Sequence, residues 1–129
     1  MLRKIIPLTV LAAAATLTAC AGMVRSPQAY RADTQKVLET RNAQIEGCYN
    51  AVLATDAAAG GTVTVRFVVE KETGTFAKAT IDPAASTAKE PIVMCVLNAV
   101  SGLKLEPPDA NEGQATFQYE LQPAPAPAT

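Results

Sequence analysis

Few residue types in this 129-residue chain can do chemistry, and three cysteines, Cys20, Cys48 and Cys95, come first among them. The chain has no histidine, so Ser-His-Asp and Cys-His catalysis are both excluded and no imidazole can activate a thiol. The three cysteines are widely separated, which excludes the CxxC spacing of redox and zinc sites. The remaining uses of a cysteine are a lipid attachment, a disulfide or a buried free thiol.

Paired carboxylates are the other route to catalysis, because one can act as a general acid while the other acts as a base. Most carboxylates of this chain fall where turns or strand ends are expected, and there solvated charge is the ordinary explanation. A small hydrolase is therefore the less favoured hypothesis, and no catalytic residue, cofactor or metal site is predicted. The carboxylates considered are Asp56, Glu70, Glu72, Asp82, Glu106, Asp109 and Glu112.

The formal net charge of the chain is −1. Nucleic-acid binding needs clustered Lys and Arg, so this charge gives no reason to expect it. Aromatic residues make up 5% of the chain and Trp is missing. A sugar site built on exposed Trp or clustered Tyr is therefore not indicated either, although a structural lipoprotein that contacts peptidoglycan remains an alternative.

The first nineteen residues have the composition of an export signal. "MLRK" carries two positive charges, and "IIPLTVLAAAATL" follows with none. About thirteen apolar residues match the core of a signal peptide, whereas a membrane-spanning helix needs about twenty. Residues 1–19 are therefore predicted to be a signal peptide.

The tetrapeptide "LTAC" at residues 17–20 resembles a bacterial lipobox: an aliphatic residue, two small residues and a cysteine. The resemblance implies cleavage before Cys20, a diacylglyceryl group on its thiol and an acyl chain such as palmitate on the new amine. Two or three acyl chains anchor a protein stably where one does not. Ala21, rather than Asp, follows the cysteine, and by resemblance to sorted lipoproteins this favours the outer membrane. An ordinary secretory signal cleaved near Ala19 is the alternative.

Periodicity predicts five elements in the rest of the chain. Apolar residues recur at helical spacing over 34–55 and again over 91–100, while period-two alternation marks strands at 62–70, 75–81 and 114–121. The order α-β-β-α-β predicts an α+β fold with two layers, in which a small antiparallel sheet packs on two helices. This domain should span 34–122, after a tether at 20–33 and before a Pro/Ala-rich, disordered tail at 123–129.

If Cys20 carries lipid, Cys48 and Cys95 remain as an even pair in an oxidising compartment. Each lies on a predicted helix, with Cys48 inside the apolar stripe and Cys95 toward the flank of its own. Two helices lying side by side could bring the thiols together. A disulfide is predicted, and two buried free thiols are the alternative.

The run from Ile45 to Leu121 is similar to the AgmX/PglI-type domain, a relative of the TonB C-terminal domain. The resemblance rests on Cys48-Tyr49, Gly61, Gly74, Cys95-Val96, Pro107-Pro108 and Phe117. It implies a TonB C-terminal-like fold and a binding role, in which an edge strand pairs with an extended segment of a partner.

The combined reading predicts a non-enzymatic outer-membrane lipoprotein whose domain faces the periplasm or the cell surface. The membrane would be reached through the lipid, and the expected partner is another envelope protein. The last strand is the candidate binding edge, although edges are commonly covered or blunted. Its candidate contact residues are Gln114, Thr116, Gln118 and Glu120.

Overall fold

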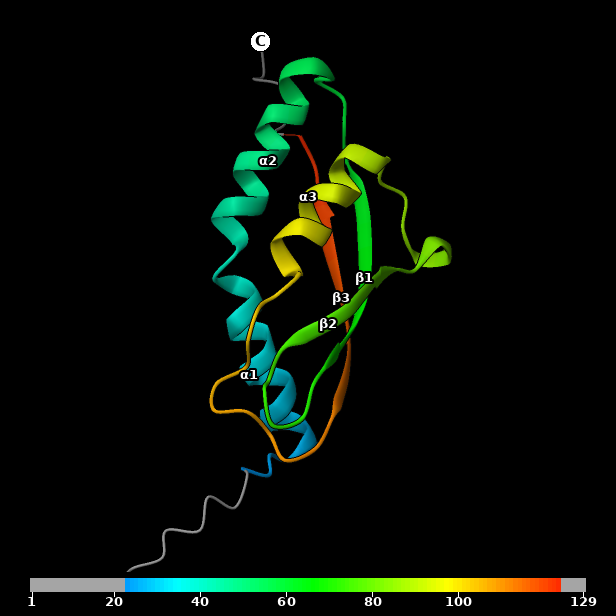
Figure 1. The fold of residues 1–129 in the computed structure, drawn as a ribbon. Helices are drawn as coiled ribbons and strands as arrows, with labels where there is room; N and C mark the ends of the chain where they lie inside the picture. Colours follow the sequence, from blue (N-terminus) through cyan, green and yellow to red (C-terminus); the bar gives the residue numbers. More distant parts are fainter. Residues whose placement is uncertain (1–22, 124–129) are drawn as a thin grey trace, which may run out of the picture.

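The computed structural model describes residues 23–123, and the elements follow one another as α1 (Pro27–Glu39), α2 (Asn42–Thr55), β1 (Gly61–Val69), β2 (Phe76–Ile81), η1 (Pro83–Ala85), α3 (Glu90–Val100) and β3 (Gly113–Leu121). Figure 1 shows α1 and α2 following one another along the length of the domain, with α3 beside α2. Cys20 and residues 1–19 lie outside the described residues, as does most of the predicted tail.

The three strands form one antiparallel sheet in the order β2-β1-β3. Strand β1 is central. It pairs with β3 over nine consecutive residues, from Gly61 opposite Leu121 to Val69 opposite Gly113. Its pairing with β2 is shorter and contains a bulge, because the register shifts between Arg66 and Val68.

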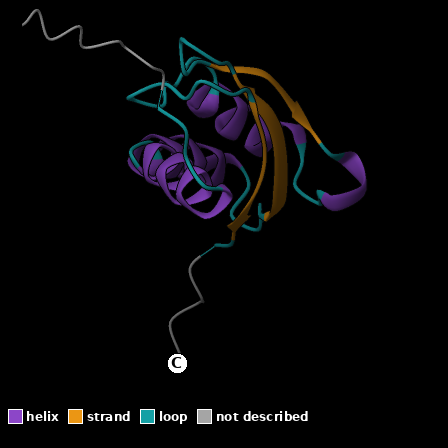
Figure 2. Ribbon diagram, turned by 90° about the horizontal axis from the view of Figure 1, so that it is seen from below, coloured by secondary structure: helices purple, strands orange, loops and turns teal. Residues whose placement is uncertain are grey.

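One face of β1 forms the centre of the core. Val63, Val65, Phe67 and Val69 alternate along the strand and are at most 3% exposed, as expected when side chains point to opposite faces of a strand. They pack against apolar residues of the helices, among them Ile92 and Val96 of α3. Figure 2 shows α1, α2 and α3 gathered on one side of the sheet, which makes the fold a two-layer α+β domain, as predicted.

The single helix predicted over 34–55 is instead two helices, α1 and α2, separated at Thr40 and Arg41. Helix α1 begins at Pro27 because Ser26 accepts a hydrogen bond from the Ala29 N–H, and proline suits the first turn. The tether predicted through residue 33 therefore ends earlier, since residues 27–33 are helical. The sequence pattern did not predict that the helix begins at Pro27, because α1 is polar and only its Thr34 and Leu38 are buried.

The other predicted elements are confirmed with bounds that shift by one residue at most. Gly74 lies in the β1–β2 turn at φ +70°, and a side chain there would overlap the backbone of Leu105. Gly102, at φ +78°, follows α3 at the predicted end. In the part of the chain that the structure describes, no helix is both long and apolar enough to cross a membrane.

Candidate binding groove along strand β3

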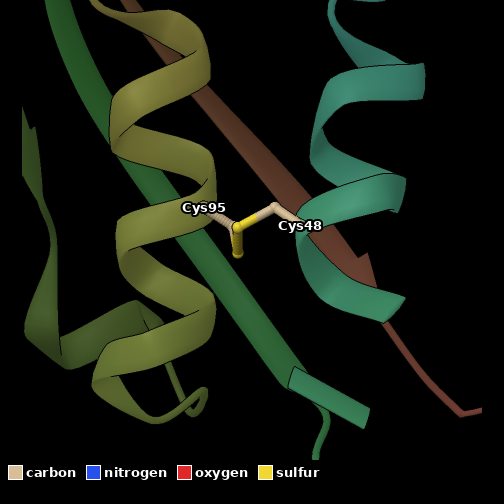
Figure 3. Close-up of a disulfide and its surroundings, with 2 residues drawn as sticks. All are labelled: Cys48 and Cys95. Atoms are coloured by element: carbon tan, nitrogen blue, oxygen red, sulfur yellow. A yellow bond between two sulfur atoms is a disulfide. The ribbon is translucent and has the colours of Figure 1, made fainter. Parts of the chain in front are cut away.

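The predicted disulfide is confirmed: Cys48 of α2 is joined to Cys95 of α3, with their Cα atoms 5.7 Å apart (Figure 3). The predicted positions of the two residues are wrong, however. Cys48 is exposed, whereas Cys95 is only 2% exposed and belongs to the core. The bond lies between α2 and α3 and ties the two helices together, so α2 is held at a fixed place above the sheet.

Strand β3 is an edge of the sheet, and its main-chain groups can be assigned to its two sides. On β1, the Thr64 N–H donates to Ser86 Oγ and the Thr64 carbonyl accepts from the Asp82 N–H, so both groups point away from β3. Main-chain groups of a strand alternate in direction along the chain. The groups of Val63 and Val65 therefore bond toward β3.

This alternation identifies the free groups of β3. Val63 lies opposite Tyr119 and Val65 opposite Phe117, so the odd-numbered residues of β3 bond to β1. The N–H and C=O groups of the even-numbered residues point to the outer edge. They belong to Gln114, Thr116, Gln118 and Glu120, which are the residues that the sequence singled out.

The side chains of β3 alternate in exposure along all nine residues. Those of Gln114, Thr116, Gln118 and Glu120 are exposed on the open face of the sheet. Those of Ala115, Phe117, Tyr119 and Leu121 face the helices and are half-buried rather than buried. The apolar face of this edge is therefore only partly covered by the domain itself.

A groove runs along β3 between this face and the helices. Three adjoining hollows of about 490, 670 and 440 Å³ follow the strand from Gly113 to Leu121. The first two share Phe117, and the last two share Tyr119 and Asn42. The opposite wall comes from α1 and α2, through Tyr30, Arg31, Thr34, Leu38, Ile45 and Leu53. We call this feature the β3 groove.

Several polar atoms in the β3 groove are buried without a hydrogen-bond partner in the described chain: Tyr30 Oη, Thr34 Oγ1 and Tyr119 Oη. Burial raises the pKa of Tyr119 to about 12, and burial together with the negative charge of Asp109 raises the pKa of Tyr30. Both phenols are therefore protonated near neutral pH and can donate. Buried polar groups normally have partners, so the walls of the groove retain hydrogen-bonding capacity that the described chain does not use.

Arg25 closes the Gly113 end of the groove. Its side chain is 1% exposed; Nε donates to Asp33 Oδ2 at 2.8 Å, and Nη2 donates to the Pro107 carbonyl at 2.7 Å. Its backbone N–H donates to Asp109 Oδ2 at 2.9 Å. The Arg25 hydrogen bond lowers the pKa of Asp33. Burial alone would raise the pKa of Asp109, but hydrogen bonds from the Asn111 and Arg25 N–H groups and the Arg25 charge bring it below its ordinary value.

Tyr30 completes this end of the groove. Its ring lies directly against Gly113, so any side chain at position 113 would overlap it. We call Arg25, Asp33, Pro107 and Asp109 the Arg25 clamp. Sequence reasoning missed it because Arg25 was assigned to the tether; the Ser26-Pro27 helix start was the available signal.

The carboxylates considered for catalysis have structural partners at several positions. Asp82 bonds to Arg66 and to the Ala84 N–H at the start of η1, Asp109 belongs to the Arg25 clamp, and Asp56 lies 4.0 Å from Lys89. Among residues 23–123, no group of three Cys, Asp or Glu residues is placed to hold a metal ion. Among residues 23–123, the β3 groove combines an unpaired strand edge with a half-covered apolar face, and this geometry suits binding.

Comparison of the chain with models of known protein families, with curated proteins and with solved structures finds no match. The fold and the groove geometry therefore carry the functional argument, and the similarity to the AgmX/PglI-type domain stays a prediction.

Proposed function

We propose that this protein is a lipid-anchored envelope protein that binds an extended segment of another envelope protein in the β3 groove. The observation that supports this most is the edge of β3. The main-chain N–H and C=O groups of four alternate residues point outward there, beside a half-covered apolar face; these residues are Gln114, Thr116, Gln118 and Glu120. A strand added there would bond to these main-chain groups, which is the β-augmentation mode of peptide recognition.

The geometry defines the kind of segment that would fit. Residues of the added strand that lie opposite Thr116 and Gln118 would point to the open face, and the alternate residues would point into the groove. There they would meet Phe117, Tyr119 and the apolar side chains of α1 and α2. The expected partner therefore alternates apolar with polar residues over about five to nine positions, with a hydrogen-bonding side chain among those that enter the groove near Tyr30 and Thr34.

The place of action follows from the proposed lipid on Cys20. The "LTAC" motif and the signal-like residues 1–19 support an acylated N-terminus, and Ala21 supports the outer membrane. In the envelope an oxidised Cys48–Cys95 pair is stable. The resemblance to the TonB C-terminal domain agrees with strand addition and adds no activity of its own.

Photo-crosslinking at matched positions would test the groove. Thr116 and Thr80 both lie opposite Arg66, on the two sides of β1, and both are exposed. A photoreactive residue at Thr116 should capture a protein segment in intact cells, and the same residue at Thr80 should not. Peptide mapping should locate the captured site in a segment of alternating polarity. Equal capture from both positions, or capture of a helical segment, would rule out strand addition at β3.

A second variant tests the same edge without a crosslinker. Thr116→Pro removes one outward N–H while leaving the bonds of β3 to β1 in place, because the Thr116 N–H points away from β1. Capture from a probe at Gln118 should then fall about tenfold, by loss of one main-chain bond and the fit of its neighbours. Unchanged capture in a folded Thr116→Pro protein would contradict the proposal.

The proposed acylation of Cys20 is tested by a separate measurement. Mass spectrometry of the mature N-terminus should find Cys20 acylated, and Cys20→Ser should release the protein from membranes. A free N-terminus at another residue would disprove the anchor while leaving the groove proposal intact.

A further inference from the structure

The described part of the chain begins three residues after the proposed lipid site at Cys20. Met23 forms a bridge with Asp109, and its carbonyl accepts from the Ala110 N–H at 2.8 Å. Two residues later the Arg25 clamp fixes the chain to the loop that contains Pro107 and Asp109. Chain position 23 is therefore attached to the folded body rather than to a tether.

Covalent geometry limits how far this point can lie from Cys20. Three residue steps separate Cys20 from Met23, and an extended chain covers at most about 3.6 Å a residue. The Cα atom of Met23 thus lies within about 11 Å of that of Cys20. A lipid on Cys20 would hold the Met23 end of the domain at the bilayer surface, whatever path the connecting residues take.

The side chains at this end fit a lipid surface. Met23 and Val24 are 46% and 70% exposed, and they are two of the three large apolar side chains exposed in the described chain. Exposed charged residues of the segments at this end include Lys71 and Glu72, whose N–H donates to the Asp109 carbonyl, and Lys104, Glu106 and Glu112 in and before the loop. Because more of these residues are acidic than basic, the contact would depend on the anchor and the apolar pair rather than on attraction to anionic headgroups.

We propose that the end of the domain formed by residues 23–25 and the loop 106–112 rests on the bilayer, with Met23 and Val24 in contact with lipid. This rests on the lipid attachment proposed above and adds an orientation to it. The opposite end, the α2–β1 connection around Ala57, points away from the membrane. Figure 1 shows α1 and α2 along the long axis, and their 13 and 14 residues place that end about 40 Å away.

The orientation gives the β3 groove a direction. Its Gly113 end, beside the Arg25 clamp, lies nearest the bilayer, and its Leu121 end lies farthest from it. A partner strand that pairs antiparallel with β3 would run toward the membrane, as the terminal segment of a neighbouring membrane protein can. The site would therefore take a segment that lies within a few tens of Å of the lipid surface.

Single tryptophans can measure this orientation, because the chain has no Trp of its own. Ala110 and Ala57 are both exposed, one beside the clamp and one at the far end. The lipidated protein would carry Ala110→Trp or Ala57→Trp in vesicles of phosphatidylethanolamine and phosphatidylglycerol with brominated acyl chains. Fluorescence of Ala110→Trp should be quenched several-fold more than that of Ala57→Trp, and added salt should not change the ratio.

A longer connection provides the matched control. Twelve Gly/Ser residues inserted between Gly22 and Met23 leave the clamp and the fold unchanged but permit the body to leave the surface. The quenching ratio should fall toward one. Val24→Ser together with Met23→Ser should also reduce quenching of Ala110→Trp.

The outcomes separate the inference from the proposal on which it rests. Equal quenching at the two positions, in a sample whose Cys20 is acylated by mass spectrometry, overturns the orientation alone. A ratio unaffected by the insertion overturns the role of the short connection and with it the inference. An unmodified Cys20 overturns both the anchor and the orientation.

Discussion

The two edge strands of the sheet, β2 and β3, differ in length, regularity and in how far other segments cover them. Strand β2 is short, contains a bulge near Lys78 at φ +54°, and continues into η1. Its first residues are covered, since the Phe76 N–H donates to the Leu103 carbonyl and Thr75 bridges to Lys104. Strand β3 has nine residues in unbroken register and, between Gly113 and Leu121, contains no proline.

Two phenylalanines show the same difference in packing. Phe76 of β2 and Phe117 of β3 both stack on Phe67 of the central strand, at centroid distances of 4.7 and 6.1 Å. Phe76 is 2% exposed, whereas Phe117 is half-buried in the β3 groove. Proteins protect sheet edges by shortening, bulging, charging or covering them. The β2 edge uses all four means, and the long β3 edge is left available for another strand.

The largest expected effect comes from the disulfide, which ties α2, a wall of the β3 groove, to α3. The double change Cys48→Ala with Cys95→Ala should lower the free energy of unfolding by about 2–4 kcal/mol, because the bond closes a loop of 47 residues in the unfolded chain. Urea denaturation at neutral pH measures it. Reduction of the wild-type protein should lower the free energy of unfolding by a similar amount. If neither the substitutions nor reduction changes the free energy of unfolding, the bond adds no stability.

Prolines at successive positions should then reveal the alternation along β3. Ala115→Pro removes a bond to β1 and leaves a buried carbonyl unsatisfied, which costs about 1–3 kcal/mol more than Thr116→Pro. The difference in urea midpoint between the two variants measures this. Equal losses would mean that the outward and inward groups of β3 have been assigned wrongly.

Acid should lower the free energy of unfolding by a smaller amount, through protonation of Asp109 in the Arg25 clamp. The folded state lowers the pKa of Asp109, so the folded chain binds fewer protons there than the unfolded chain, whose Asp pKa is about 3.9. This contribution to stability is present above about pH 4 and is lost as the pH falls through the folded pKa. In Asp109→Asn the free energy of unfolding should change less between pH 5 and pH 3 than in the wild type. Asp33 also has a lowered pKa, so Asp33→Asn is the control for the neighbouring carboxylate.

The smallest expected effect is the difference in stability between removing the Tyr49 hydroxyl, which has a hydrogen-bond partner, and removing the Tyr119 hydroxyl, which has none in the described chain. Tyr49 Oη donates to the Ala59 carbonyl at 2.6 Å, so Tyr49→Phe should cost about 1 kcal/mol. Tyr119 Oη has no partner in the described chain, and Tyr119→Phe should be neutral or slightly stabilising in the isolated domain. The same change should weaken capture by the Thr116 crosslinker if a bound strand supplies the missing hydrogen bond. A loss of stability equal to that of Tyr49→Phe would show that the chain already satisfies Tyr119.

Much of the fold could be predicted because local patterns and global packing agree. The strict alternation of Val63, Val65, Phe67 and Val69 identifies the central strand, and helical spacing from Ile92 to Val100 identifies α3. The start of helix α1 does not follow from the sequence pattern because its residues are mostly polar and its stability comes from the cap, the clamp and a few buried residues. A polar helix carries little periodic signal.

The candidate site was predictable only in part. Alternation in β3 identified the residues that present the edge, since main-chain direction and side-chain direction alternate together. The opposite wall of the groove, with Tyr30 and Thr34, was not predictable, because it depends on where α1 packs. For the Arg25 clamp, the Ser26-Pro27 helix start indicated only that the chain is ordered nearby; its partners Pro107 and Asp109 are more than eighty residues away and could not be predicted.

By itself the sequence determined the three strands, helix α3 and their order, favoured a Cys48–Cys95 disulfide over two free thiols, and contained the signal-like N-terminus with its lipobox-like "LTAC". These depend on neighbouring residues, on the count of residue types, or on a single even pair. Only the tertiary structure decided that β2 is closed and β3 open, that a groove lines β3, and that Arg25 joins the N-terminal segment to the loop beside it. Those features arise from contacts between distant segments, and their free energy depends on burial and geometry that no local pattern contains.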